Sequence, residues 1–453
     1  MQSLLPHAAA SACILTVIEI VRQRLHDTAF MVRHRLTDQA FTRQRRLTFP
    51  VVMLLILQKS AKSLQRHLHE FFARWAQGTL SPGTSKGAWT QARAKLSHTA
   101  FLELNEQAVL ATAYAPEHQA SLRRWRGRLL VAMDSSLARL PDHPDLARSF
   151  ARVQAANQHG ETVSYYEGRV SVLDDVLNRL GRDGRLASSA LGEVELARQH
   201  GASLRPEDVV LFDRGFTGYE HLARLLMVKQ DFIGRCSRGS FAAAQALFLR
   251  NEADLSVIVT LRAPPDQRRR LRAEAVPLRL TVRLVTVRLT TGELEVLVTS
   301  LCDELAYPTA SFAEAYHQRW GLETYYHQLK SHLDLENWSG RTEAAIRQDF
   351  HAAVFLCNVE SLVSAPAQVA LAARTSARQQ PAQINRADGL HALKMRVIEL
   401  FASACPAEAV LADLVRLFQA NPTAVRPDRK VPRQKPSMWR SYHFQRCVRK
   451  MVF

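Results

Sequence analysis

The sequence predicts a mixed α/β core that follows a helical unit, and three observations support this. Two apolar runs, residues 128–134 and 208–213, are too short for helices, and each ends in an aspartate. The stretch between them alternates strand-like and helix-like patterns. Residues 255–301 are rich in Val, Leu and Thr, which favours strands. At 453 residues, of which 47% are hydrophobic, the chain is long enough for two to four folded units.

Residues 1–120 are predicted to form an N-terminal helical DNA-binding domain. Apolar residues recur every three or four positions between residues 11 and 113, as on the buried face of a helix. Residues 84–95 and 97–110 look like two helices of a small bundle. Four arginines are expected on its exposed faces: Arg22, Arg24, Arg33 and Arg35. A basic bundle with a purely structural role fits any one of these arginines equally well.

Residues 121–235 are predicted to form the first part of the α/β core. Its expected strands are residues 128–134, 163–173, 175–180, 208–213 and 231–235. Its expected helices are residues 191–199 and 219–227. This alternation of strands and helices is typical of an α/β sheet.

A mostly β insertion domain is predicted at residues 236–301. Its expected strands are residues 255–261, 276–289 and 293–301, with the last two joined as a hairpin. The core is expected to resume over residues 302–370, with helices at residues 311–332 and 342–364. Residues 371–453 are predicted to be a C-terminal helical segment and a basic tail.

The net charge indicates a polyanionic partner. Sixty Lys and Arg against 42 Asp and Glu give +18, which favours nucleic acid over an anionic membrane surface. The six cysteines are scattered without a CxxC pair, as is typical of reduced intracellular thiols. The apolar run near the N-terminus is too short to span a bilayer. We therefore expect a soluble cytoplasmic protein that does not bind a membrane.

Residues 316–330, YHQRWGLETYYHQLK, place one carboxylate among basic and aromatic groups. Four side chains share one stripe, roughly 60° wide, on a helix that turns about 100° per residue: Tyr316, Arg319, Glu323 and Lys330. Such a stripe can bind a metal ion and a phosphate group together, because Glu can ligate a hard divalent cation while Arg and Lys bind the phosphodiester. A solvated face with ion pairs at helical spacing is the ordinary alternative.

Asp134 and Asp213 each close an expected strand and join Glu323 as three carboxylates from three elements. Neighbouring strand ends and a facing helix can bring such groups together, and carboxylate ligands favour Mg²⁺ or Mn²⁺ over zinc. Two such ions about 3.5–4 Å apart can activate a water or a 3′-hydroxyl and stabilise the leaving oxygen of a phosphodiester. An aspartate that closes a strand is more often a turn former or cap, so neither decides the function alone.

The stripe matches the Tyr-(2)-Arg-(3)-Glu-(6)-Lys signature of DDE transposases of the insertion sequence four family, which this chain resembles. Asp213-Arg-Gly-Phe216 is similar to that family's second-aspartate motif. Met133-Asp134-Ser-Ser136, followed by Arg139-Leu-Pro141, is similar to the first. The resemblance extends to Phe41-Thr-Arg-Gln-Arg-Arg-Leu-Thr-Phe49 and to Asn385-Arg386, and it therefore covers most of the chain.

The resemblance implies an RNase H-like catalytic core, a mixed sheet flanked by helices, which the mostly β insertion interrupts before Glu323. It implies that Asp134, Asp213 and Glu323 are catalytic and ligate Mg²⁺ or Mn²⁺, as two ions. It further implies that five residues contact DNA: Tyr316, Arg319, Lys330, Arg214 and Trp320. The expected reaction is nicking at the transposon end, after which the freed 3′-hydroxyl attacks the opposite strand or target DNA.

The same resemblance implies the partners and the setting. The partners would be double-stranded transposon ends with terminal inverted repeats, and target DNA. Pairing two ends implies a homodimer in the synaptic complex. The protein would act in the bacterial cytoplasm, at the nucleoid when it is bound to DNA.

Family members that pass through a DNA hairpin are expected to stack a flipped base on an aromatic side chain, often a Trp of the β insertion. None of the six Trp residues lies between the second aspartate and the signature. Phe241, Phe248 or Trp320 would therefore have to serve. Trp320 and Trp338 are both expected to pack in the core, because aromatic residues on helical faces usually do.

Three functions are left open by the sequence. The first is an active transposase. The second is a transposase-derived protein that binds DNA without cutting it, which the retention of all three carboxylates argues against. The third is another RNase H-like nuclease, such as a resolvase of branched DNA, which would cleave junctions regardless of the end sequence.

Overall fold

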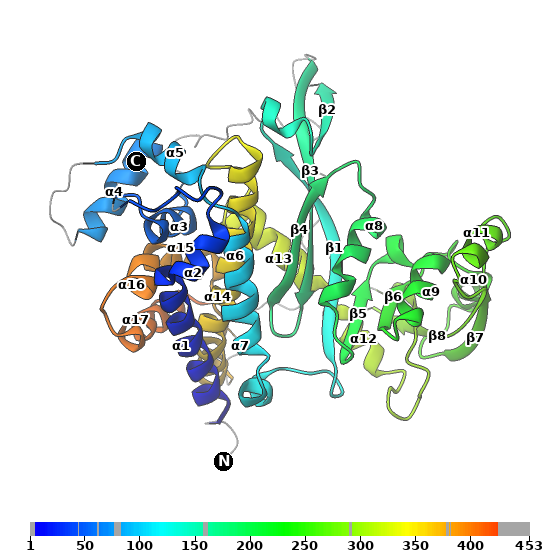
Figure 1. Ribbon diagram of the computed structural model, residues 1–453. Coiled ribbons are helices and arrows are strands. Elements are labelled where there is room, and N and C mark those ends of the chain that lie inside the picture. The colour runs from blue at the N-terminus through cyan, green and yellow to red at the C-terminus, as the bar shows by residue number, and fades with distance from the viewer. Residues whose placement is uncertain are drawn as a thin grey trace.

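The computed structural model describes residues 5–43, 45–60, 63–76, 83–156, 162–289, 292–376, 380 and 382–424. Within them the chain builds a nine-stranded mixed sheet with a helical body on one side, and the insertion lies at the far end of the sheet (Figure 1). The basic tail predicted at the C-terminus lies beyond residue 424, outside the described residues.

The helical body begins with helices of very different length, one of which is apolar throughout. They are α1 (Leu5–His26), α2 (Thr28–His34), α3 (Phe49–Leu57), α4 (Leu64–Trp75), α5 (Lys86–Arg93), α6 (Thr99–Glu103) and α7 (Ala111–Ala113), with a π-helical stretch at Leu104–Leu110. Helix α3 is apolar on every side and almost wholly buried, which is the pattern of a core helix. Pro50, near its first turn, suits a helix start, where no backbone N–H is needed.

The C-terminal helices complete the same body. They are α14 (Glu343–Thr375), α15 (Arg386–Met395), α16 (Val397–Phe401) and α17 (Ala407–Ala420), beside a small sheet of β10 (Ala382–Gln383) and β11 (Thr423–Ala424). By length and composition α14 could cross a membrane, but 72% of its apolar window is buried inside the protein. It packs against α1, α3 and the sheet, so the first and last helices share one core.

Of the four arginines expected on exposed faces of the N-terminal bundle, Arg33 is exposed and the other three are half-buried, and all four bind other groups of the chain. The Arg22 guanidinium donates to the backbone carbonyls of Leu400 and Cys405, which ties α1 to the α16–α17 corner. The other three pair with acids: Arg24 with Asp27, Arg33 with Glu103 and Arg35 with Asp38. A helix pattern predicts which residues avoid the core, but it does not show which acids or carbonyls the fold brings to them.

The sheet has the strand order β2-β3-β1-β5-β6-β9-β8-β7, with β4 paired to β3. Its core strands are β1 (Leu129–Leu140), β2 (Ala151–Ala156), β3 (Thr162–Asp175), β4 (Leu180–Ser188), β5 (Asp208–Phe212) and β6 (Asp231–Arg235). Helices α8 (Glu193–Arg198) and α9 (Tyr219–Met227) connect them. Strands β1, β5 and β6 run parallel, and the other pairs are antiparallel. This arrangement confirms the predicted RNase H-like mixed sheet flanked by helices.

Two strand predictions are wrong. The first apolar strand does not end at Asp134 but continues to Leu140, because its polar half pairs with β3 over its whole length. Residues 176–179, between β3 and β4, form a turn rather than a strand, and Arg179 takes a left-handed φ of 57° there. The strand expected in that turn begins only at Leu180.

The insertion extends the central sheet. Its strands are β7 (Ser256–Arg262), β8 (Arg279–Arg288) and β9 (Leu294–Thr299), and β8 and β9 pair in antiparallel fashion as the predicted hairpin requires. Because β9 also pairs with β6, these strands continue the core sheet. Helices α10 (Ala242–Arg250) and α11 (Arg268–Ala273) were not predicted, and they make the insertion less purely β than expected.

The helix predicted over residues 311–332 is divided. It consists of α12 (Ser311–His317), α13 (Trp320–His327) and a π-helical stretch, Gln328–His332. At the division the backbone tightens, because the N–H groups of Gly321 and Leu322 bond to carbonyls only three residues back. Lys330 lies on the π-helical stretch, so the four signature residues do not share one regular helix.

The buried His221 of α9 predicts a loss of stability at acidic pH. Burial, with the Arg198 charge, lowers the pKa of His221 to about 4, and both ring nitrogens lack a hydrogen-bond partner. Because the unfolded chain binds the proton near pH 6.5, the stability due to neutral His221 is complete above that pH and is lost as the pH falls toward 4. Between pH 7 and 5 the wild type should lose about 2 kcal/mol more than His221→Leu, as measured by urea unfolding.

The matched control for this test is His391→Leu, which changes an exposed histidine of α15. This control should lose as much stability as the wild type between the two pH values. An equal loss in His221→Leu and in the wild type would show that His221 does not resist protonation in the folded state.

Candidate active site

Three parallel strands place charged side chains in a row where they end. The register of β1 on β5, continued two residues past its last pair, puts Asp134 beside Asp213. The register of β5 on β6, continued by one residue, puts Asp213 beside Arg235. Alternate residues of a strand share a face, so these three side chains lie on the side of Leu211 and Ile233, which pack in the core under the helical body.

Two tyrosine hydroxyls fix helices α12 and α13 over these strand ends. The Tyr326 hydroxyl donates to the Asp134 carbonyl at 2.7 Å and accepts from the Val172 N–H at 3.0 Å. The Tyr316 hydroxyl donates to the carbonyl of Phe212 at 3.4 Å, one residue before Asp213. Glu323 precedes Tyr326 by three residues, so it lies on the side of α13 that faces Asp134.

Arg319 lies between two of the acids. Its side chain is buried, and its Nη2 is 3.4 Å from Oε1 of Glu323. Its positive charge also opposes the rise in the pKa of Asp134 that burial causes, so the guanidinium is close to that carboxyl as well. The guanidinium is held above the Tyr316 ring at 5.7 Å and the Trp320 ring at 5.3 Å.

Asp134 lies in an environment that disfavours its negative charge. Burial is the main cause that raises the pKa of Asp134 to about 6, and the charges of Glu193 and Asp213 act in the same direction. The Ser135 N–H, which donates to Oδ1 of Asp134 at 2.7 Å, opposes the shift. Two neighbouring carboxylates in a half-buried place are stabilised by a cation.

Arg235 supplies such a cation, and the sequence reasoning missed it. Its Nε donates to Oδ1 of Asp213 at 3.0 Å, and its Nη1 donates to Oε1 of Glu295 at 2.9 Å. Asp213 also accepts from the Arg214 N–H at 2.7 Å. The signal was present in the sequence, because Arg235 closes the expected strand at residues 231–235 just as Asp213 closes its own.

In the described part of the chain, no three His, Cys, Asp or Glu side chains lie close enough together to hold a metal ion. The structure brings Asp134 and Asp213 side by side, whereas Glu323 faces them with Arg319 between. The positive charge next to these acids comes from two arginines: Arg235, which pairs with Asp213, and Arg319, which pairs with Glu323. The donor set still fits a hard divalent cation, since it consists of carboxylates and includes one whose ionised form is disfavoured.

The other predicted DNA contacts differ in exposure. Lys330 reaches β1, where its Nζ donates to the Leu137 carbonyl, and Arg214 is exposed in a turn directly after Asp213. Tyr316 is buried, with its hydroxyl turned to the strand end. The predicted role of these residues and of Arg319 in binding DNA stays a prediction.

The two tryptophans near the site were both expected in the core, and one is not. Trp338 is buried, and its indole N–H donates to the carbonyl of Arg139 at 2.8 Å. Trp320 is 46% exposed, so the prediction that it packs in the core is wrong. The reason is the division of the helix before Trp320, after which the ring rests on the Arg319 guanidinium.

Comparison with known proteins shows the family to which the chain belongs. A family model described as the transposase DDE domain matches residues 125–359, which is more than half of the chain and includes all three carboxylates. The chain belongs to this transposase family. Among solved structures, the transposase is similar to one described as the piggyBac transposase synaptic complex with hairpin DNA, with 11% sequence identity and a TM-score of 0.42 over 90% of this chain and 85% of that chain. No curated protein matches the sequence.

Proposed function

We propose that this chain is the transposase of a bacterial insertion sequence, acting in the cytoplasm and cutting and joining DNA with Asp134, Asp213 and Glu323. The observation that carries the proposal is the strand register that sets Asp134 beside Asp213, under a helix that carries Glu323 on the facing side. The family match over the same residues supports it.

The three carboxylates would hold Mg²⁺ or Mn²⁺ as two ions. Bound there, the metal would activate the attacking water or 3′-hydroxyl and neutralise charge on the leaving oxygen. The chain's own residues orient the acids: the Ser135 N–H holds the carboxylate of Asp134, and Tyr326 fixes α13 to the same strand. When a metal ion takes its place on Asp213, the bond to Glu295 would keep Arg235 near the site as a positive charge for the phosphodiester.

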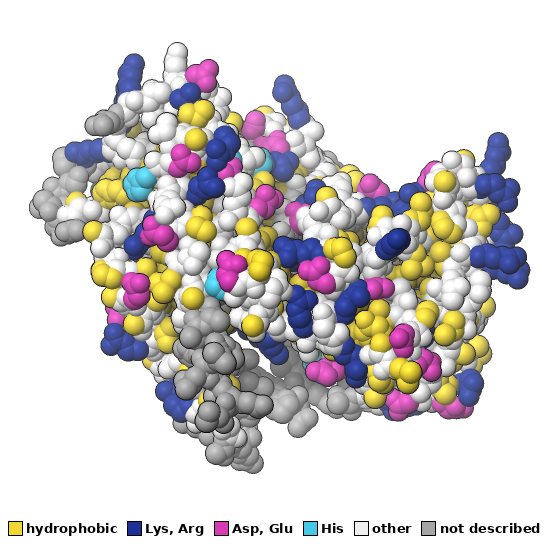
Figure 2. Space-filling view, turned by 60° about the horizontal axis from the view of Figure 1, so that its bottom comes forward, with side chains coloured by type: hydrophobic (Ala, Val, Ile, Leu, Met, Phe, Trp, Pro, Cys, Tyr) yellow, Lys and Arg dark blue, Asp and Glu magenta, His cyan; other side chains and the backbone are white. Residues whose placement is uncertain are grey.

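Double-stranded DNA is the proposed substrate, as terminal inverted repeats and as target. Lys and Arg side chains, dark blue in Figure 2, gather in the middle of one face and at the end where Figure 1 shows the insertion. Trp320, exposed on α13 one turn before Glu323, presents an aromatic face on which a base displaced from the duplex can stack. Two chains, each holding one DNA end, would form the synaptic complex as a homodimer.

Cleavage of the element's own ends tests this proposal. Purified protein with Mg²⁺ should nick a duplex that carries the terminal repeat at the repeat boundary, and a chelator should stop the reaction. Binding without metal-dependent nicking would instead support a DNA-binding protein derived from a transposase. Cleavage of branched junctions regardless of end sequence would support a different RNase H-like nuclease.

Arg235 gives a further prediction about the metal. Arg235→Gln should bind Mn²⁺ at least roughly tenfold more tightly than the wild type, because the ion no longer competes with a guanidinium for Asp213. Isothermal titration without DNA measures this affinity. Arg262→Gln changes an exposed arginine of β7 and should leave it unchanged. Weaker Mn²⁺ binding by Arg235→Gln would show that the arginine supports the metal site instead of competing for it.

A further inference from the structure

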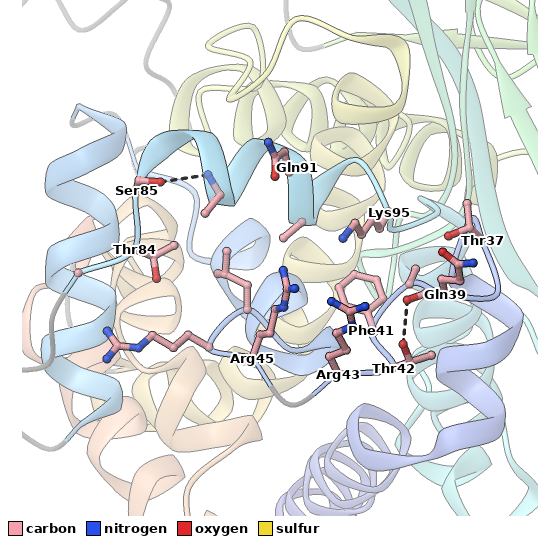
Figure 3. Close-up of a pocket in the computed structure, with 16 residues that line it drawn as sticks. Thr37, Gln39, Phe41, Thr42, Arg43, Arg45, Thr84, Ser85, Gln91 and Lys95 are labelled. Carbon is pink, nitrogen blue, oxygen red and sulfur yellow. Dashed lines mark hydrogen bonds between the residues drawn. The ribbon is translucent and has the colours of Figure 1, made fainter.

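A pocket of about 920 Å³ opens in the helical body between the loop after α2 and helix α5 (Figure 3). The loop side consists of Thr37, Gln39, Ala40, Phe41, Thr42, Arg43, Arg45, Arg46 and Leu47, and the other side of Gly83, Thr84, Ser85, Ala88, Gln91, Ala92 and Lys95. Four of these residues are cationic, six carry a hydroxyl or an amide, and none is acidic. The pocket contains most of the segment 41–49, to which no role has yet been given.

The loop side of the pocket is anchored to the core. Phe41 takes a left-handed φ of 60°, and its ring packs edge-on against Phe49 at 5.5 Å. Phe49 in turn packs against Phe30 at 5.7 Å, inside the hydrophobic core. The Leu36 N–H donates to the carbonyl of Lys95 at 2.9 Å, which ties the start of the loop to the chain beyond α5. The arginines after Phe41 therefore extend from a fixed base.

The opposite side of the pocket is one face of α5. Ser85 caps the helix by accepting from the Ala88 N–H at 3.2 Å, Ala88 and Gln91 lie on its exposed side, and the exposed Lys95 lies in the turn just beyond its end. On the other side of α5, Trp89 and Arg93 are buried. Figure 3 shows Gln91 and Lys95 across the pocket from Arg43 and Arg45.

The cations of this pocket differ from the other N-terminal arginines. Arg22 donates to backbone carbonyls, and Arg24, Arg33 and Arg35 pair with acids of the chain, as described above. In the described part of the chain, the side chains of Arg43, Arg45 and Lys95 make no ion pair, although all three are exposed. Unpaired cations on two facing walls, with neutral donors between them, suit an anion that lies along the pocket.

We propose that this pocket binds the phosphodiester backbone of duplex DNA, and this inference rests on the proposed function. Arginine, lysine, hydroxyl and amide donors are the groups that contact phosphate oxygens, and such contacts position a duplex without reading its sequence. The pocket shares no residue with the carboxylate site on the sheet. The duplex would thus be held at two places, one for chemistry and one for position.

The salt dependence of binding tests this proposal. The double variant Arg43→Ala/Arg45→Ala removes two cations from one wall, and Lys95→Ala removes one from the other. The probes are a fluorescent duplex carrying the terminal repeat, an unrelated duplex and a single strand, each titrated by anisotropy at several salt concentrations. The control is Arg416→Ala, an exposed arginine of α17 outside the pocket. Circular dichroism verifies that each variant is folded.

The double variant should bind both duplexes at least roughly tenfold more weakly, and its slope of log K against log salt should fall by about 1.8, since each phosphate contact contributes about 0.9. Lys95→Ala should lower the slope by about 0.9, and the control should not change it. The control Arg416→Ala should also nick a terminal-repeat duplex at the wild-type rate, because this residue lies outside both the pocket and the carboxylate site.

If the wild-type protein nicks the duplex and the pocket variants show the same salt slopes as the wild type, the pocket proposal is overturned and the proposed function stands. A loss confined to the single strand would also overturn it. If the wild type neither binds nor nicks any duplex, both the pocket proposal and the proposed function fail.

Discussion

Asp134→Asn is expected to lower metal-dependent nicking by on the order of 10³-fold or more while the protein stays folded. Asparagine has the same shape, and its side-chain oxygen can still accept the Ser135 N–H that holds Asp134 at 2.7 Å. It lacks the negative charge beside Asp213 that a hard cation needs. Single-turnover nicking of a terminal-repeat duplex in Mg²⁺ measures the effect, and anisotropy verifies that DNA binding is kept.

Asp142→Asn is the matched control for this experiment. Asp142 follows the same strand, is exposed, and pairs with Arg152 at 3.1 Å on the surface. The same chemical change there should leave nicking within about twofold of the wild type, because surface ion pairs contribute little. Equal nicking by Asp134→Asn and Asp142→Asn would remove Asp134 from the catalytic set.

Asp349→Ala is expected to destabilise the protein by about 3–5 kcal/mol, the largest stability effect that we predict. Asp349 of α14 is buried, with Arg93 Nη2 at 2.7 Å and Lys59 Nζ at 3.9 Å. Although burial raises the pKa of Asp349, the charges of Arg93 and Lys59 together with the hydrogen bonds from Ser339 outweigh it and hold the pKa below its usual value. Removing the carboxylate leaves the buried Arg93 and the partly buried Lys59 without this partner, at the joint that holds α5 against the core.

Urea unfolding at pH 7 measures this loss, and Asp413→Ala is the control. Asp413 lies on α17 and pairs with the exposed Arg416, so its removal should cost no more than about 1 kcal/mol. Similar losses in the two variants would show that the Arg93–Asp349 pair is not a main support of α5.

Much of the fold could be predicted because the central strands are short, apolar and bounded by charged residues. β5 and β6 lie where the apolar runs indicate, and α9 fills the segment between them. The end of β1 could not be predicted in this way. Beyond Asp134 the strand is polar, and only its antiparallel pairing with the distant β3 keeps it extended.

The acids of the candidate site could be predicted from the sequence, but their partners could not. Strand ends and helix spacing single out Asp134, Asp213 and Glu323, and the family resemblance implies their role as metal ligands. The ion pairs that Arg235 and Arg319 make with Asp213 and Glu323 depend on the sheet register and on the division between α12 and α13. Trp320 was expected in the core because aromatic residues on helical faces usually pack there, but it is 46% exposed and its ring lies against the Arg319 guanidinium.

The central claim is that Asp134, Asp213 and Glu323 together hold the catalytic metal. Anomalous diffraction from crystals of the protein with Mn²⁺ and a terminal-repeat duplex tests it most directly. We predict manganese peaks bounded by these three carboxylates, with Arg319 moved off Glu323, and no such peaks in crystals of Asp134→Asn. Manganese bound only elsewhere, or peaks that persist unchanged in Asp134→Asn, would contradict this account of the site.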